Sequence, residues 1–86
     1  MGRVSVHLIG EAVRYHRRRS GLSQRDLADL ADVGKTSVFD IEKGKPTIRL
    51  ATLVAVLSVL NIQMVMDSPL MDEFVATLPD RGDSTP

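Results

Sequence analysis

Four consecutive residues, Gly34, Lys35, Thr36 and Ser37, have the types and the order that end the phosphate-binding loop of many nucleotide-binding proteins. Such a loop also needs a glycine five residues before its Gly-Lys pair and a β-strand leading into it, because backbone amides must wrap the phosphates. Asp29 occupies that earlier position, inside a segment of helical pattern, and its carboxylate would repel a phosphate. The four residues therefore begin a helix with another purpose.

The histidines and cysteines offer no alternative chemistry. His7 and His16 lie nine residues apart without a further ligand at a metal-binding spacing, and no nucleophile stands next to a base. The chain has no cysteine, so it can form neither a disulfide framework nor a thiolate metal site. We therefore expect a protein that is not an enzyme and that uses no metal or cofactor. The lack of cysteine and of a secretory signal pattern predicts a cytoplasmic location.

Charge is distributed unevenly along the 86 residues, although the net charge is zero. Residues 1–49 hold ten lysines and arginines against six acidic residues, a balance of +4, whereas residues 50–86 hold one against five, a balance of −4. The amino-terminal half could therefore face a polyanion such as nucleic acid. On charge alone, Arg14 and the arginines at 17–19 could equally serve only to solvate a helix.

Hydrophobic periodicity predicts a compact all-α domain of four short helices with brief connections. We expect helices over residues 8–20, 24–31 and 35–43, and a fourth that opens at Pro46 and continues until the period changes after Asn61. The predicted inward residues are Leu27, Ala28, Leu30 and Ala31 in the second helix, Val38 and Ile41 in the third, and Leu50, Leu53, Val54, Leu57 and Leu60 in the fourth.

The segment LSQRDLADLADVGKTSVFDIEKGKPT, residues 22–47, contains two of these helices joined by a three-residue turn. A helix that begins with exposed small and basic side chains fits the major groove of duplex DNA. The segment resembles the phage-repressor (Xre) type of helix-turn-helix, whose pattern of Ser-Gln, Leu-Ala, turn, valine, Ile-Glu and glycine it follows without a gap. The resemblance implies a lambda-repressor-like domain that binds double-stranded operator DNA.

Two positions depart from the family pattern. Asp32 stands where the family often has glycine, and aspartate tolerates a left-handed backbone better than most residues. Gly34 stands where a serine or threonine usually caps the recognition helix, which costs only a few tenths of a kcal/mol relative to serine. Neither change removes the motif, although the start of the helix is expected to be looser.

The resemblance also implies where DNA contacts lie, and phosphate contacts position the protein while base contacts specify the sequence. Base-edge positions of the family correspond to Lys35, Thr36 and Asp40, with Ser37 and Phe39 nearby. Alternatively, Asp40 pairs with Lys43 one turn later, Phe39 packs on a neighbouring helix, and Ser37 is only a tolerated small residue. The predicted phosphate contacts are Ser23, Gln24, Arg18, Arg19, Lys43 and Lys45.

Arg17 provides an internal check on the fold. It lies four residues after Val13 and eight after Ile9, on the inward stripe of the first helix, where an unpaired guanidinium would be costly to bury. The resemblance gives it a partner, Glu42, next to the inward Ile41. An ion pair between Arg17 and Glu42 would hold the first helix against the third.

The fourth helix is apolar nearly all round, which is more than one side of a small domain can bury. Polar residues interrupt it before it reaches the roughly 20 residues of a membrane span, so we expect a homodimer and no membrane. Residues 62–67 then alternate like a β-strand, which could pair antiparallel with the same segment of a second copy; a frayed coil or a longer helix is the alternative. The predicted dimer interface comprises Val56, Val59, Leu60, Ile62, Met64 and Met66.

A helix-turn-helix domain that ends in such a strand is similar to the HipB-type antitoxins. This resemblance implies an autorepressor of a type II toxin-antitoxin operon that also binds a HipA-like serine/threonine kinase toxin. A stand-alone repressor without a toxin, or a protein-interaction module with no specific DNA site, is the alternative. A gel-shift over a salt series separates DNA binding from the last of these, since phosphate contacts make affinity fall steeply with salt.

The predicted organisation has four parts. Residues 1–61 form the DNA-binding domain, residues 62–67 the dimerising strand, and residues 68–79 a short amphipathic helix opened by Ser68 and Pro69 and stopped by Pro79. This acidic helix could contact either a partner protein or its own dimer. Residues 80–86 are expected to be a disordered tail.

Overall fold

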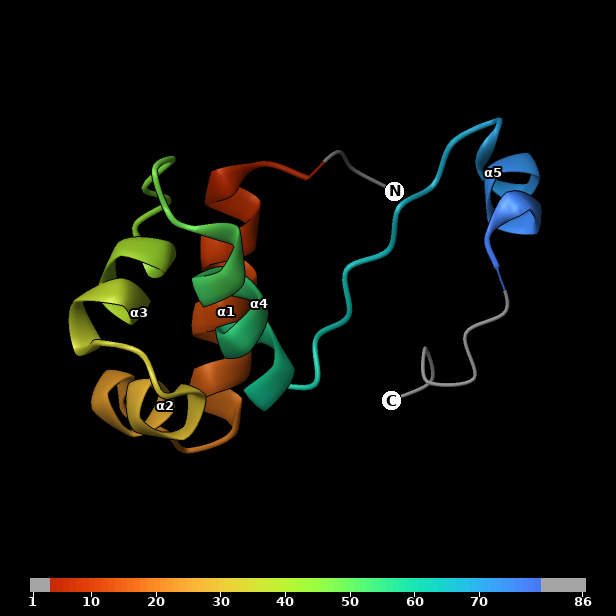
Figure 1. Ribbon diagram of the computed structural model, residues 1–86. Coiled ribbons are helices and arrows are strands. Elements are labelled where there is room, and N and C mark those ends of the chain that lie inside the picture. The colour runs from red at the N-terminus through yellow and green to blue at the C-terminus, as the bar shows by residue number, and fades with distance from the viewer. Residues whose placement is uncertain (1–3, 80–86) are drawn as a thin grey trace.

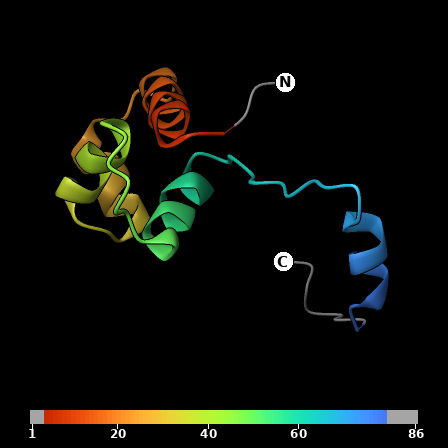
Figure 2. The same ribbon diagram turned by 90° about the horizontal axis from the view of Figure 1, so that it is seen from above.

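The computed structural model describes residues 4–79, and these contain five α-helices (Figure 1). The predicted tail, residues 80–86, lies outside the described residues. Helices α1 to α4 form one unit, and α5 stands apart from it at the end of an extended segment (Figures 1 and 2). The helices are α1 (Val6–Arg19), α2 (Gln24–Ala31), α3 (Lys35–Glu42), α4 (Leu50–Val59) and α5 (Met71–Thr77).

Local capping sets where the first helices begin and end. The hydroxyl of Ser5 accepts a hydrogen bond from the Leu8 amide at 3.1 Å, so α1 begins two residues earlier than expected. Gly21 follows α1 with a φ of 74°, a left-handed conformation that favours glycine. The prediction that α4 opens at Pro46 is wrong, because residues 46–47 form a turn, residues 48–49 have no regular structure, and the helix starts at Leu50.

The core joins one side of each of the first four helices. Its fully buried members are Val13 of α1, Leu27 of α2, Val38 of α3 and Val56 of α4. The prediction for Leu30 is wrong, since that side chain lies on the outer face of α2 and is exposed. The rest of the core, Ala28, Ile41 and Leu57 among it, follows the prediction.

The buried stripe of α4 differs from the predicted one. The residues that pack inward lie at 53, 56, 57 and 60, the i, i+3, i+4, i+7 spacing of a single helix face. Leu50 and Val54 therefore point outward and are exposed, against the prediction. The assignment of Val56 and Leu60 to a dimer interface is wrong for the same reason, because both are buried within their own chain.

Gly10 allows α1 and α3 to approach closely. A Cβ atom at this position would lie 2.8 Å from the carbonyl oxygen of Glu42 and closer still to that of Ile41. Both oxygens belong to the backbone at the end of α3, which cannot turn aside as a flexible side chain can. Any larger residue at position 10 would therefore separate the two helices.

Residues 62–68 have no regular secondary structure, so the predicted strand at 62–67 is absent from the single chain. No other strand among residues 4–79 could provide a ladder, and pairing with a second copy stays a prediction. The alternative of a longer fourth helix is wrong, since Asn61 adopts a left-handed φ of 58° after α4 ends. Helix α5 also starts later than predicted, with Leu70 rather than Ser68 at its N-cap.

None of the helices between residues 4 and 79 combines the length and apolar character that crossing a membrane requires.

Candidate nucleic-acid interface

Helices α2 and α3 are joined by the three-residue turn Asp32–Gly34. Asp32 adopts the left-handed conformation, with φ 57° and ψ 46°, as its place in the sequence predicted. The amide of Asp32 donates to the carbonyl of Asp29 at 3.2 Å, and that of Val33 donates to the carbonyl of Ala28 at 3.0 Å. These bonds satisfy the last carbonyl groups of α2 and fix the direction in which α3 leaves.

The start of α2 is held by a capping box. The Ser23 hydroxyl accepts from the Asp26 amide at 2.9 Å, while the Asp26 carboxylate accepts from the Ser23 amide at 3.2 Å. The predicted phosphate contact at Ser23 would therefore have to share a hydroxyl that already serves the helix.

Helix α3 turns its two sides to different environments. Val38 and Ile41 are buried against the core, whereas Lys35 and Thr36 are exposed at its first turn. Gly34 provides no side-chain cap, as expected, and the first turn contains no acidic residue. The exposed start of α3 therefore combines free backbone amides with a lysine, a combination that favours a negatively charged partner.

The side chains in the middle of α3 are partly exposed. Phe39 is 45% exposed and lies outside the buried core, and the Lys43 ammonium lies 5.2 Å from the centre of its ring. The alternative for Asp40 is wrong, because Asp40 pairs not with Lys43 but with Lys45, at 3.5 Å. The Asp40 carboxylate therefore offsets the positive charge of Lys45, which is one of the predicted phosphate contacts.

The predicted ion pair between α1 and α3 is confirmed. Arg17 donates from Nε to Oε2 of Glu42 at 2.6 Å and from Nη2 to Oε1 at 3.1 Å, and its Nη1 donates to the Leu22 carbonyl at 2.8 Å. The hydrogen bond to Glu42 raises the pKa of Arg17 above its already high ordinary value, although burial opposes the shift. Gln24 joins the network by donating from Nε2 to Oε1 of Glu42 at 3.1 Å.

A basic notch of about 280 Å³ lies beside this ion pair. Arg14 and Arg18 of α1 line one wall, and Phe39 and Lys43 of α3 line the other, with Gln24 between them. Neither Arg14 nor Arg18 lies within 4.0 Å of a carboxylate among the described residues. The notch therefore presents cationic groups whose charges are not neutralised nearby, next to the exposed side of α3.

A model of the helix-turn-helix family matches residues 13–65, which include α2, α3, the turn between them and α4. The chain belongs to the helix-turn-helix family. Xre-type regulators of this family were expected from residues 22–47, and the match supports that expectation over a longer segment.

Two relatives of the helix-turn-helix chain are named as transcriptional regulators. An HTH-type transcriptional regulatory protein of Methanothermobacter thermautotrophicus is 32% identical over 78 residues, 91% of this chain but only 24% of that protein. The HTH-type transcriptional regulator y4mF of Sinorhizobium fredii is 36% identical over 61 residues, 71% of this chain and 80% of that protein. The chain thus spans about a quarter of the archaeal relative and most of the bacterial one.

Solved structures share the fold of this helix-turn-helix protein. A HipB–O4 20mer complex has a TM-score of 0.70 at 19% identity, over 80% of this chain and 97% of that one. A HipA–HipB–O2–O3 complex has a TM-score of 0.71, also at 19% identity, over 80% and 97% of the two chains. The restriction-modification controller protein C.AhdI from Aeromonas hydrophila has a TM-score of 0.61 at 28% identity, over 67% and 88%. The HipB-like architecture expected from the sequence is therefore confirmed as a fold.

The helix-turn-helix fold brings four of the eleven predicted contact residues together in the notch. They are Arg18, Gln24, Phe39 and Lys43. Arg19 is not among its lining residues; its guanidinium lies 5.9 Å from the centre of the Tyr15 ring. Arg14 also lines the notch and was not among the predicted phosphate contacts, although its spacing of four residues from Arg18 places both on one face of α1.

Proposed function

We propose that the chain is a homodimeric, sequence-specific DNA-binding repressor whose α3 enters the major groove. The observation that carries this proposal is the position of the notch along the exposed side of α3, where Phe39 and Lys43 line it. A helix seated in the groove brings the flanking phosphates against the elements next to it. In this proposal Arg14, Arg18 and Lys43 meet such phosphates, while the exposed Lys35 and Thr36 reach base edges.

The side chains proposed as base contacts suit particular bases. A lysine suits the O6 and N7 acceptors of guanine, and the methyl group of a threonine suits that of thymine. Asp40 could accept from the N4 amino group of cytosine, although its pairing with Lys45 has to break or bend for that contact. Ser37 is half-buried, so less of its side chain is available for a base contact than that of the exposed Lys35 or Thr36.

A second copy would match a two-fold operator with half-sites one helical turn apart. The candidates for its contact surface are apolar residues that the single chain leaves exposed. Met64 and Met66 are 51% and 72% exposed, and Val59 and Ile62 are half-buried. These four residues are the members of the predicted dimer interface that are still candidates. The exposed Val54 lines the same hollow as Ile62 and Met64.

The test is a gel-shift on the promoter of the chain's own operon over a series of salt concentrations. Repression by direct DNA binding predicts an affinity that falls steeply as salt rises, with random DNA bound far more weakly. A protein-interaction module predicts no shift, or a shift that does not distinguish the promoter from random DNA.

The fold favours one finer proposal, that the chain is a HipB-like antitoxin that binds a HipA-like kinase and represses its own operon. Its support is the structural likeness to HipB, including HipB in complex with HipA. A kinase encoded next to this gene should copurify with the tagged chain. A stand-alone regulator is the second candidate, supported by the likeness to the controller protein C.AhdI, and it predicts no neighbouring kinase.

A further inference from the structure

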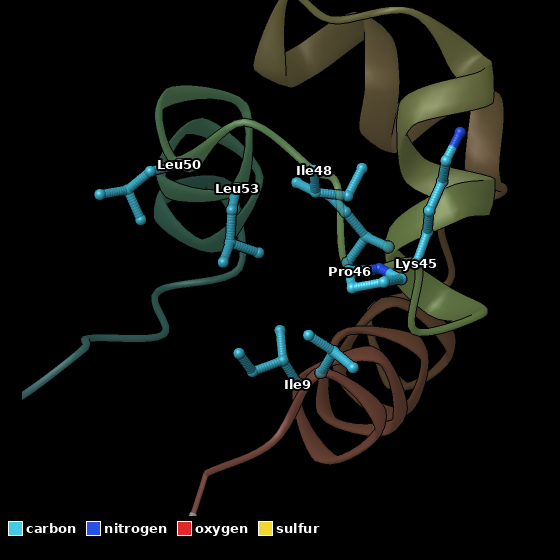
Figure 3. A pocket seen from close by; sticks show the side chains of 8 residues that line it. Ile9, Lys45, Pro46, Ile48, Leu50 and Leu53 are labelled. Atoms are coloured by element: carbon cyan, nitrogen blue, oxygen red, sulfur yellow. The ribbon is translucent and has the colours of Figure 1, made fainter.

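An apolar groove lies on the helical unit beside the first turn of α4, with the start of α1 and the α3–α4 loop as its other walls (Figure 3). Its volume is about 120 Å³. Ile9, Ile48 and Leu53 line its floor and sides, and Leu50, which is 67% exposed, stands at its edge. The groove therefore offers a concave apolar surface that residues 4–79 leave uncovered.

The α4 end of this groove is positive. Lys45 belongs to the lining but is paired with Asp40, so the positive charge comes from the exposed Arg49, which immediately precedes α4. Helix α4 has no side-chain cap at Arg49 and no acidic residue in its first turn, so its partial positive charge is not compensated locally. An occupant with an apolar face and acidic flanks would match both the groove and its positive end.

Helix α5 has that character and no partner of its own. Phe74 is 50% exposed, Leu70 and Val75 are more so, and Asp72 and Glu73 lie in its first turn. The helix is seven residues long and stands clear of α1 to α4 (Figures 1 and 2). Isolated helices shorter than about 12 residues are marginal in water, so α5 needs a surface to pack on.

We propose that α5 of one copy docks in this groove on a second copy, with the Phe74 ring in the cavity. Asp72 and Glu73 then lie toward Arg49 and the first turn of α4. The groove volume of about 120 Å³ is somewhat below the roughly 150 Å³ of an enclosed cavity that holds a benzene ring, so the Phe74 ring would fill it and extend to its open side. This docking rests on the proposed dimer and extends it beyond residues 62–67, because it adds a contact between the end of one chain and the core of the other.

The connecting segment is long enough for this exchange. Residues 60–70 link α4 to α5, and eleven extended residues reach about 36 Å. The groove lies at the first turn of α4, and this helix is only about 15 Å long, so the linker is more than twice the length of the helix that separates its start from the groove. A second copy is the occupant that we favour because, within one chain, the same segment carries α5 away from the helical unit (Figure 1).

The absence of cysteine from the chain allows a direct test by crosslinking. A full-length Leu70→Cys chain, which keeps Phe74, is mixed with a full-length Leu50→Cys chain and treated with a short bismaleimide. Docking in the groove predicts a shift from the 9.4 kDa band of one chain to a band of twice that mass. The matched control is Leu30→Cys, which places an equally exposed thiol on α2 outside the groove.

Three results would overturn the docking. Equal crosslinking to Leu50→Cys and Leu30→Cys would show random collision, and no crosslinking to Leu50→Cys would show that α5 does not reach the groove. A chain carrying both Leu70→Cys and Leu50→Cys that loses both thiols while it keeps the mass of one chain would show that α5 folds onto its own unit. A gel-shift with the same variants keeps the two proposals apart, since specific DNA binding without the crosslink rejects only the docking, and the crosslink without DNA binding rejects only the repressor.

Discussion

The Nε atom of Arg17 lies 2.6 Å from Oε2 of Glu42, which ties the end of α1 to the last residue of α3. Both side chains are largely buried, and a second guanidinium nitrogen and the Gln24 amide also bond the same carboxylate. One acidic group therefore holds α1, the start of α2 and the end of α3 together. The recognition helix is aligned by a charge cluster as much as by apolar packing.

Replacing Glu42 with glutamine should lower the free energy of unfolding by about 3 kcal/mol, because Arg17 would remain buried without a charged partner. Urea denaturation monitored by circular dichroism measures this change. The double variant Arg17→Met, Glu42→Leu should recover most of the loss, since an apolar pair leaves no unpaired charge. A double variant that is less stable than Glu42→Gln would contradict this view of the pair.

The stabilisation from Arg17 should not change with pH around neutrality. Its pKa is raised in the folded chain, so its contribution is complete below the unfolded pKa and is lost only as pH rises through the folded one. Both values lie far above the neutral range. The difference in unfolding free energy between the wild type and Arg17→Met should therefore be constant from about pH 7 to about pH 9, and a steady decline over that range would argue against a charged Arg17.

Gly10→Ala should destabilise the chain by about 1 to 3 kcal/mol, because the new methyl group meets the backbone carbonyls of Ile41 and Glu42. Thermal unfolding gives the measurement. Gly34→Ser is the matched control, since nothing lies within 4 Å of a Cβ at that position and a serine there would cap α3. A neutral Gly10→Ala would show that α1 and α3 can separate without loss.

Lys35→Ala and Arg14→Ala should affect DNA binding in different ways. The first should weaken binding to the preferred site by about 1 to 3 kcal/mol and leave binding to random DNA nearly unchanged, because a base contact is lost. The second should weaken both alike and reduce the dependence on salt by about one phosphate contact. Fluorescence anisotropy on both DNAs measures the two effects, and a specific loss from Arg14→Ala would reverse the assignment.

Met66→Asp should shift the chain from dimer to monomer without lowering the stability of the helical unit, because Met66 is 72% exposed in the single chain. Sedimentation velocity reports the shift. If residues 62–67 form a strand across the dimer, Val65→Asp should have a much smaller effect, since alternate side chains lie on opposite faces. Equal effects at both positions would reject the strand and leave a contact of another kind.

The motif could be predicted from the sequence because it depends on local rules, whereas Glu42, the partner of Arg17, came only from the family resemblance. Helical periodicity, the left-handed Asp32 and the register of residues 22–47 depend on local backbone preferences and on spacing along one helix. The burial of Arg17 could be predicted for the same reason, as it continues the inward stripe of α1.

Which face of α4 is buried depended on how the helices pack together. A helix that is apolar nearly all round has no periodic signal to separate its inner side from its outer one. Leu50 was therefore predicted to be buried and is exposed, whereas Val56 was predicted to lie at a dimer interface and is buried. The same limit applies to Arg14, Asp40 and Lys45, whose neighbours lie on other elements or beyond a turn. Charges and apolar groups at the surface acquire their partners from packing, and a linear pattern does not contain that information.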